Sequence, residues 1–158
     1  MNCMQVSTVD HPALALLPDA PTRDQIERFG AYLFALETTH GAADVGTRHH
    51  HVRGLYGRSV DIKAGTFGVG VPHKDACFVV CIGDIETWTA QGRQRFTGLH
   101  IVESNPGPRI VFARADTTWF TVHRNDTGTT DIEAIEAATF DTPERLLSRR
   151  AVTSGELE

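Results

Sequence analysis

The chain has 158 residues, 41% of them hydrophobic and 22% charged, which is the composition of one folded domain with a core of its own. A net charge of -5 gives no general attraction to nucleic acid or acidic membranes, and no run of about 18 apolar residues predicts a membrane span. The first residues lack a basic stretch, and three cysteines are an odd number for a disulfide framework. We therefore expect a cytoplasmic protein with no nucleic-acid or membrane partner.

The N-terminal part is expected to be an irregular arm over residues 1–21, followed by a helix. "TRDQ" at 22–25 has the pattern of a capping box, in which Thr22 caps the helix and Gln25 reaches back. Apolar residues then recur at helical spacing, which predicts a helix over 23–38.

The middle of the chain changes to short strand-like runs separated by turn residues. Turns are expected at Lys63–Gly65, Gly83–Asp84, Gln91–Gly92 and "NPGP", with a joint at Asp116. Short strands at this spacing, with no helix between them, indicate an antiparallel sandwich or barrel over about residues 50–124. The expected strands are 53–62, 66–71, 76–82, 85–89, 93–104, 109–115 and 117–123.

After residue 124 the pattern returns to helix. "TDIE" at 130–133 is a second capping-box pattern, and Pro143 suits a first helical position. These signals predict C-terminal helical segments over 130–150. The single domain is thus expected to cover 22–150, with 151–158 as a flexible tail.

Several motifs occur in order at compatible spacing: the "HH" pair before "GLYGR", then "AGT", "HK", "GDI", the "PG" break, "TWFTVH" and "TDIEAIE". Over roughly residues 22–145 they resemble the small cupin-like proteins of tailed phages and prophages. The resemblance implies a mainly β fold: one antiparallel barrel or jelly roll with an N-terminal helix and C-terminal helical segments. It also implies a lumen that often holds a divalent metal through histidines and one acid, in the cytoplasm of a host cell.

The sequence departs from the general cupin pattern at three places. Val71 stands where the first histidine of the first motif is usual, and Cys77 stands near the carboxylate position. The segment "NPGPRIVF" offers no histidine for the second motif.

The pair His73 and Cys77 is the sharpest candidate for metal chemistry. In one straight strand, residues four apart are separated by about 13 Å, so the pair can share an ion only if the chain reverses at Lys74–Asp75. The alternative is that Cys77 and Cys81 are buried core residues on one strand face.

Histidines from other segments complete the candidate set. His123 closes "TTWFTVH" and is either a ligand at the barrel mouth or hydrogen-bonded at the rim. The resemblance places the triplet 49–51 where one imidazole, taken as His50, could enter the lumen, whereas the alternative is a solvated loop. His100, between apolar neighbours, is expected in the core. The predicted metal ligands are His73, Cys77, His123 and His50, for zinc, iron, nickel or copper.

Three functions stay open at this point. The first is a metal-dependent enzyme acting on a small molecule. The second is a non-catalytic small-ligand or counter-defence module, and the third is a structural or assembly protein with a degenerate metal site. A homo-oligomer is expected, because the amphipathic helix and the long arm offer more apolar surface than a small barrel needs.

Overall fold

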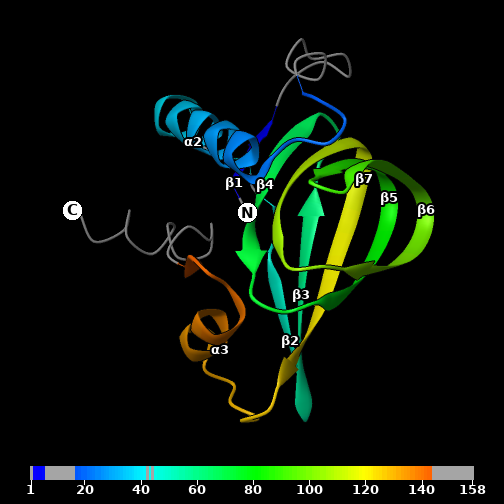
Figure 1. Cartoon of the computed structure of the whole chain (residues 1–158). Coiled ribbons are helices and arrows are strands. Elements are labelled where there is room, and N and C mark those ends of the chain that lie inside the picture. The colour runs from blue at the N-terminus through cyan, green and yellow to red at the C-terminus, as the bar shows by residue number, and fades with distance from the viewer. Residues whose placement is uncertain (1, 6–16, 42, 44, 144–158) are drawn as a thin grey trace.

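A computed structural model describes residues 2–5, 17–41, 43 and 45–143, and it is dominated by β-strands (Figure 1). The two described helices lie beside the sheet and not between its strands. In chain order the elements are β1 (Asn2–Gln5), α2 (Arg23–His40), β2 (Arg48–Val52), β3 (Gly54–Ile62), β4 (Thr66–His73), β5 (Cys77–Thr89), β6 (Gly92–Ser104), β7 (Gly107–Asn125) and α3 (Ile132–Thr139).

All strand pairs of the sheet are antiparallel. The sheet runs β1-β4-β7-β3-β2, and β5 joins it by pairing with β7 on one side and β6 on the other. β7, with 19 residues, is long enough to pair with β4 along its first half and with β3 along its second. The expected fold class, mainly β and antiparallel with flanking helices, is confirmed. The sheet is unclosed within the described residues, because β1, β2 and β6 each pair with a single strand there.

Two expected breaks are not turns. β5 runs without interruption through Gly83–Asp84, and β7 runs through Asp116. The two places lie side by side, since Asp84 is paired with Ala115 and the β5–β7 register shifts on both sides of Asp84. Glycine and aspartate mark an irregularity in the pairing of two long strands here. The same residues are typical of turns, so the sequence alone does not distinguish the two structures.

The arm prediction is also wrong at its start. Residues 2–5 form β1, which pairs with the edge of β4 in the register Asn2↔Val69 to Gln5↔Thr66. Such pairing uses backbone groups, so it needs no alternating side-chain pattern and leaves little trace in the sequence. The rest of the predicted arm to residue 16 lies outside the described residues.

The helix starts follow the capping signals closely. Thr22 and Gln25 form both hydrogen bonds of the predicted capping box, and α2 continues to His40. At α3 the cap is Asp131 and not Thr130, because the Asp131 carboxylate accepts from the backbone N–H of Glu133 and Ala134. Residues 144–150 of the predicted C-terminal helical region lie outside the described residues.

Side chains from the two faces of the sheet form separate cores. The inner face, defined by Val79, Val111 and Trp119, forms one cluster with neighbours from β3 and β5. The outer face, defined by Ile110 and Phe112, is covered by Ile26 and Leu33 of α2. Neither described helix is long and apolar enough to cross a membrane.

Candidate metal centre

His73 and Cys77 come together because the chain reverses between two strands. His73 ends β4, Cys77 begins β5, and Lys74–Ala76 make the bend. α3 holds this bend in place: Thr139 O accepts from the Lys74 backbone N–H at 3.0 Å, and Ala137 O accepts from Lys74 Nζ at 2.6 Å. As a result His73 Nδ1 lies 3.2 Å from Cys77 Sγ, compared with about 13 Å between such positions in a straight strand.

His123 completes a group of three metal-ligating side chains. It lies on the inner face of β7 with Trp119 and Thr121, as the period-two alternation requires. The His73 and His123 rings meet edge to face with centroids 4.8 Å apart. One ligand atom from each of His73, Cys77 and His123 can be chosen so that all three lie within 4.8 Å of one another.

Burial keeps both imidazoles neutral. Phe140, which follows α3, packs its ring 5.3 Å from the His73 ring and 5.8 Å from the His123 ring. This burial lowers the pKa of His73 well below its usual value and lowers the pKa of His123 to about 4, with the charges of Arg58 and Arg109 acting in the same direction. Neutral imidazole is the form that binds metal, so both rings are ready to bind at neutral pH.

The Cys77 thiol is also shielded from water. Burial raises its pKa, while the nearby Arg109 charge and a hydrogen bond with Ser104 oppose that rise. Without a metal the residue is therefore a thiol at neutral pH, and its hydrogen bond with His73 is satisfied. A bound metal would deprotonate it, because only the thiolate is a strong ligand.

Cavities reach this group from two sides. His73 lines a cavity of about 20 Å³ with Arg109 and Trp119, which has room for one water or ion. His123 lines a separate depression of about 350 Å³ between the end of β7 and α3. The group is thus buried but close to solvent-accessible space.

The predicted ligand His50 is not brought to this group. Its Nε2 lies 3.1 Å from Ser59 Oγ, and its ring meets Phe120 edge to face at 5.4 Å, on the outer face of the sheet. His49 is the member of the triplet that turns toward the group: its Nδ1 lies 2.7 Å from Tyr56 Oη, and the Tyr56 ring stacks on His123 at 6.3 Å.

The remaining candidate histidine lies away from the group. His100 is half-buried on β6, with Nε2 3.0 Å from Thr97 O.

Sequence reasoning missed three residues that shape the site. Arg58 and Arg109 are 7% and 8% exposed on the inner face, and Phe140 covers the two histidines. Alternation along "RIVFARA" could have placed Arg109 on the same face as Val111. Because arginine is rarely buried, alternation alone does not predict that Arg109 lies inside the protein.

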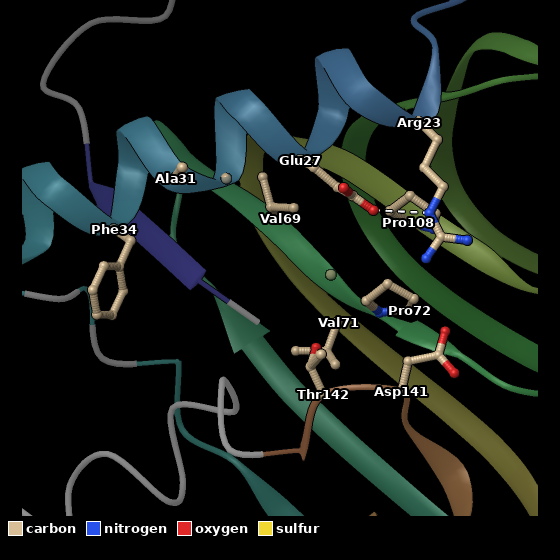
Figure 2. A pocket seen from close by; sticks show the side chains of 12 residues that line it. Arg23, Glu27, Ala31, Phe34, Val69, Val71, Pro72, Pro108, Asp141 and Thr142 are labelled. Carbon is tan, nitrogen blue, oxygen red and sulfur yellow. Dashed lines mark hydrogen bonds and ion pairs between the residues drawn. The ribbon is translucent and has the colours of Figure 1, made fainter.

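A different groove lies on the outer side of β4, beneath α2 (Figure 2). Its volume is about 340 Å³, and its walls are mainly aliphatic, with Val69 beneath the helix and Val71 and Pro72 on the side toward Asp141 and Thr142. Its rim carries the ion pair in which Arg23 donates to Glu27 at 2.8 Å. None of the side chains that line it is a histidine or a cysteine, so the metal candidate belongs to the inner face.

No protein-family model and no curated protein matches the sequence. Among solved structures the chain is similar to ectoine synthase from P. lautus, with 19% identity over 51% of this chain and 64% of that one, at a TM-score of 0.42. It is also similar to a cupin-2 domain containing protein from Shewanella frigidimarina NCIMB 400, with 6% identity over 58% of this chain and 92% of that one, at a TM-score of 0.43. It is similar as well to oxalate decarboxylase from Lactobacillus farciminis, with 15% identity over 73% of this chain and 40% of that one, at a TM-score of 0.43.

These similarities are partial. The chain spans less than two thirds of the length of the ectoine synthase, at 64%, and 40% of the decarboxylase. One of the three proteins is named as a cupin, the family that the sequence motifs resemble. Neither the site nor the function proposed below rests on them.

Proposed function

We propose that the protein binds one divalent metal ion through His73, Cys77 and His123, and that it acts there on a small molecule. The observation that carries the proposal is the convergence of three ligand atoms within 4.8 Å from the end of β4, the start of β5 and the second half of β7. The two histidines and the thiol are all types that bind metals in proteins.

The residues fit a tetrahedral ion after a small adjustment. Bonds of about 2.0–2.3 Å place the ligand atoms of such an ion about 3.3–3.6 Å apart. The 3.2 Å from His73 to Cys77 is close to this range, and the farthest pair of the group must approach by roughly 1 Å. His123 Nε2 is buried with no hydrogen-bond partner among the described atoms, and a metal bond would satisfy it.

The ligand set also favours one class of metal. A thiolate with two imidazoles prefers zinc, iron, nickel or copper to magnesium, and zinc suits a buried thiolate best. Three protein ligands leave a fourth position open, where such an ion supplies Lewis acidity or an activated water. His73 and His123 would orient the ion, and Phe140 would exclude bulk water from it.

The phage or prophage origin and the cytoplasmic location remain part of this proposal. The origin is supported by the ordered motifs from "HH" to "TDIEAIE", and the location by the odd number of cysteines, three, which does not suit a disulfide framework. Genomic context in an isolated host would test the origin directly.

The test compares two cysteines of the same strand face. Wild-type protein loaded with cobalt should show a thiolate-to-cobalt charge-transfer band at one equivalent, and purified protein should contain zinc or another metal of this class. Cys77→Ser should lose the band, while Cys81→Ser, buried on the same face of β5, should keep it. His73→Ala should lower metal content, and His50→Ala should not.

The opposite results would remove the metal proposal. If wild-type protein takes up no metal, or if Cys77→Ser binds cobalt with the unchanged band, the His73–Cys77 contact is an ordinary hydrogen bond of the core. The metal-free small-ligand module and the assembly protein would then be the functions to pursue.

A further inference from the structure

Arg109 is a buried positive charge with neutral described partners. Its side chain is 8% exposed, and its Nη2 donates to Ser104 Oγ and to Asn105 O. Its guanidinium carbon lies 6.0 Å from the centre of the Trp119 ring. A buried charge is costly unless an anion offsets it, and neither described acceptor carries a charge.

The position of Arg109 connects two cavities. With Trp119 it lines the cavity of about 20 Å³ beside His73, and both residues also line a cavity of about 170 Å³ on the inner side of the β5–β6 hairpin. The larger cavity has the volume that roughly six waters occupy in the liquid. Its other walls include the neutral side chains of Thr87, Gln94 and Phe96.

We infer that the larger cavity binds a small organic carboxylate, with the carboxylate on Arg109 and the apolar part against Trp119 and Phe96. The planar guanidinium matches a carboxylate by two parallel hydrogen bonds. The acid that also lines the cavity, Glu103, is exposed at its rim and does not neutralise the buried end. This inference deepens the proposed function, because it names the substrate class and places its charged end toward His73.

The test uses benzoate and benzamide, which have nearly the same shape and differ in charge. In metal-free protein prepared with chelator, benzoate should bind at least ten-fold more tightly than benzamide and should shift the Nε–Hε resonance of Arg109. Arg109→Met should abolish the preference, Arg109→Lys should keep part of it, and Arg95→Met, an exposed arginine, should leave it unchanged.

Because the titration is done without metal, its outcome is separate from the outcome of the cobalt experiment. Equal affinity for the two compounds, or an Arg109 resonance that benzoate does not move, would overturn the inference even if Arg109→Met fails to fold.

A second inference rests on the outer face of the β5–β6 hairpin. Phe78, Ile82, Leu99 and Ile101 are 55%, 54%, 67% and 73% exposed. The strand register makes them neighbours, with Ile82 opposite Leu99 and Val80 opposite Ile101. Together with Val80, the four exposed side chains form a set of five that we call the hairpin patch. Exposed apolar side chains that gather in one place, unlike scattered ones, mark an interaction surface.

Charges along β6 indicate what covers the hairpin patch. Arg95, which also pairs with Asp84 of its own chain, and Glu103 lie on the same strand face as Leu99 and at equal distances before and after it. A two-fold axis that lies in the contact plane and crosses β6 at Leu99 reverses the strand direction. It therefore brings Arg95 of one copy opposite Glu103 of the other, on both sides of the axis.

We propose that the hairpin patch is covered by the same patch of a second copy of the chain. This places the expected homo-oligomer contact on β5 and β6, since α2 uses Ile26 and Leu33 to cover its own sheet. The contact is independent of the metal and carboxylate proposals.

Light scattering tests the dimer with one disruptive and one control variant. Wild type should be dimeric at tens of micromolar, and Ile101→Glu should be monomeric. Val52→Glu, which adds the same charge at a residue 66% exposed on β2, should remain dimeric. Glu103→Arg should weaken the dimer, and adding Arg95→Glu together with Asp84→Asn, which removes the carboxylate beside residue 95, should restore part of it. A monomeric wild type, or a dimer unaffected by Ile101→Glu, would overturn this proposal.

Discussion

The two halves of β7 differ in how fully the outer face is covered and in the chemistry of the side chains they bury. In the first half Ile110, Val111, Phe112 and Ala113 are all 0% exposed, with α2 on the outer face and the inner core beneath. In the second half the inner face buries Thr121 and His123 beside Trp119, while Phe120 and Val122 on the outer face are only half-buried.

The difference separates the part of the strand that stabilises the fold from the part that carries the candidate site. Buried apolar side chains stabilise by about 1.5–3 kcal/mol each. Buried imidazoles and guanidinium groups cost free energy unless they find partners, so several of them together are expected to serve a function other than stability. We therefore expect substitutions in the two halves to affect different properties.

The largest expected effect comes from removing an aromatic ring in the first half. Phe112→Ala should lower the free energy of unfolding by about 3–5 kcal/mol, because the ring is fully buried between α2 and the sheet. Phe120→Ala, on the same strand face in the second half, should cost less than half as much. Urea denaturation of both variants in the Ile101→Glu background removes any contribution from self-association.

An equal loss for both phenylalanines would contradict the comparison. It would mean that the outer face of the second half is as tightly covered within one chain as the first half is under α2.

The second expected effect is a dependence of stability on pH, which arises from His123 in the second half of β7. Burial and the charges of Arg58 and Arg109 lower the pKa of His123 to about 4, whereas Asp75 acts weakly in the opposite direction. The pKa of His73 is lowered by the same causes. Between the unfolded pKa of about 6.5 and the folded value, the unfolded chain binds a proton that the folded chain does not.

In the metal-free protein, the contribution of the two neutral histidines to the free energy of unfolding should therefore be fully present above pH about 6.5. It should be lost as the pH decreases toward 4. One pKa unit corresponds to about 1.4 kcal/mol, so His123 alone contributes at most about 3 kcal/mol over its range. Denaturation measured from pH about 7 to 5 should show this slope, and His123→Phe should reduce it, leaving the part that His73 contributes. A wild-type slope unchanged by His123→Phe would show that the ring is not held neutral by the fold.

The fold was predictable wherever a local pattern decides it. Alternation predicted the strands around Val79 and Trp119, and the capping box predicted the start of α2, because these signals depend on neighbours in sequence. The continuity of β5 through Gly83 was not predictable, since it depends on pairing with β7 across the sheet.

The candidate site was predictable in part for the same reason. The approach of His73 to Cys77 follows from a reversal that Lys74–Asp75 suggests, and the face of His123 follows from alternation. The burial of Arg109 depends on Ser104 and Trp119, which come from two different strands. No spacing in the sequence expresses such a contact.

The smallest expected difference between two matched variants concerns the junction between the two halves. Gly83 has φ 146°, and a Cβ there would meet the backbone oxygen of Asp116 at 2.7 Å, while Gly98, its partner on β6, has φ 87° with nothing within 4 Å of a Cβ. Both Gly→Ala changes place a side chain in a strained conformation, at roughly 1–3 kcal/mol. Gly83→Ala should cost a further 1 to 3 kcal/mol, roughly the penalty of overpacking, because the Asp116 backbone cannot move without disturbing β7. Urea denaturation of the two variants measures the difference directly. Equal losses would show that β7 yields at Asp116, and that the two halves are joined less rigidly than the close approach at Gly83 requires.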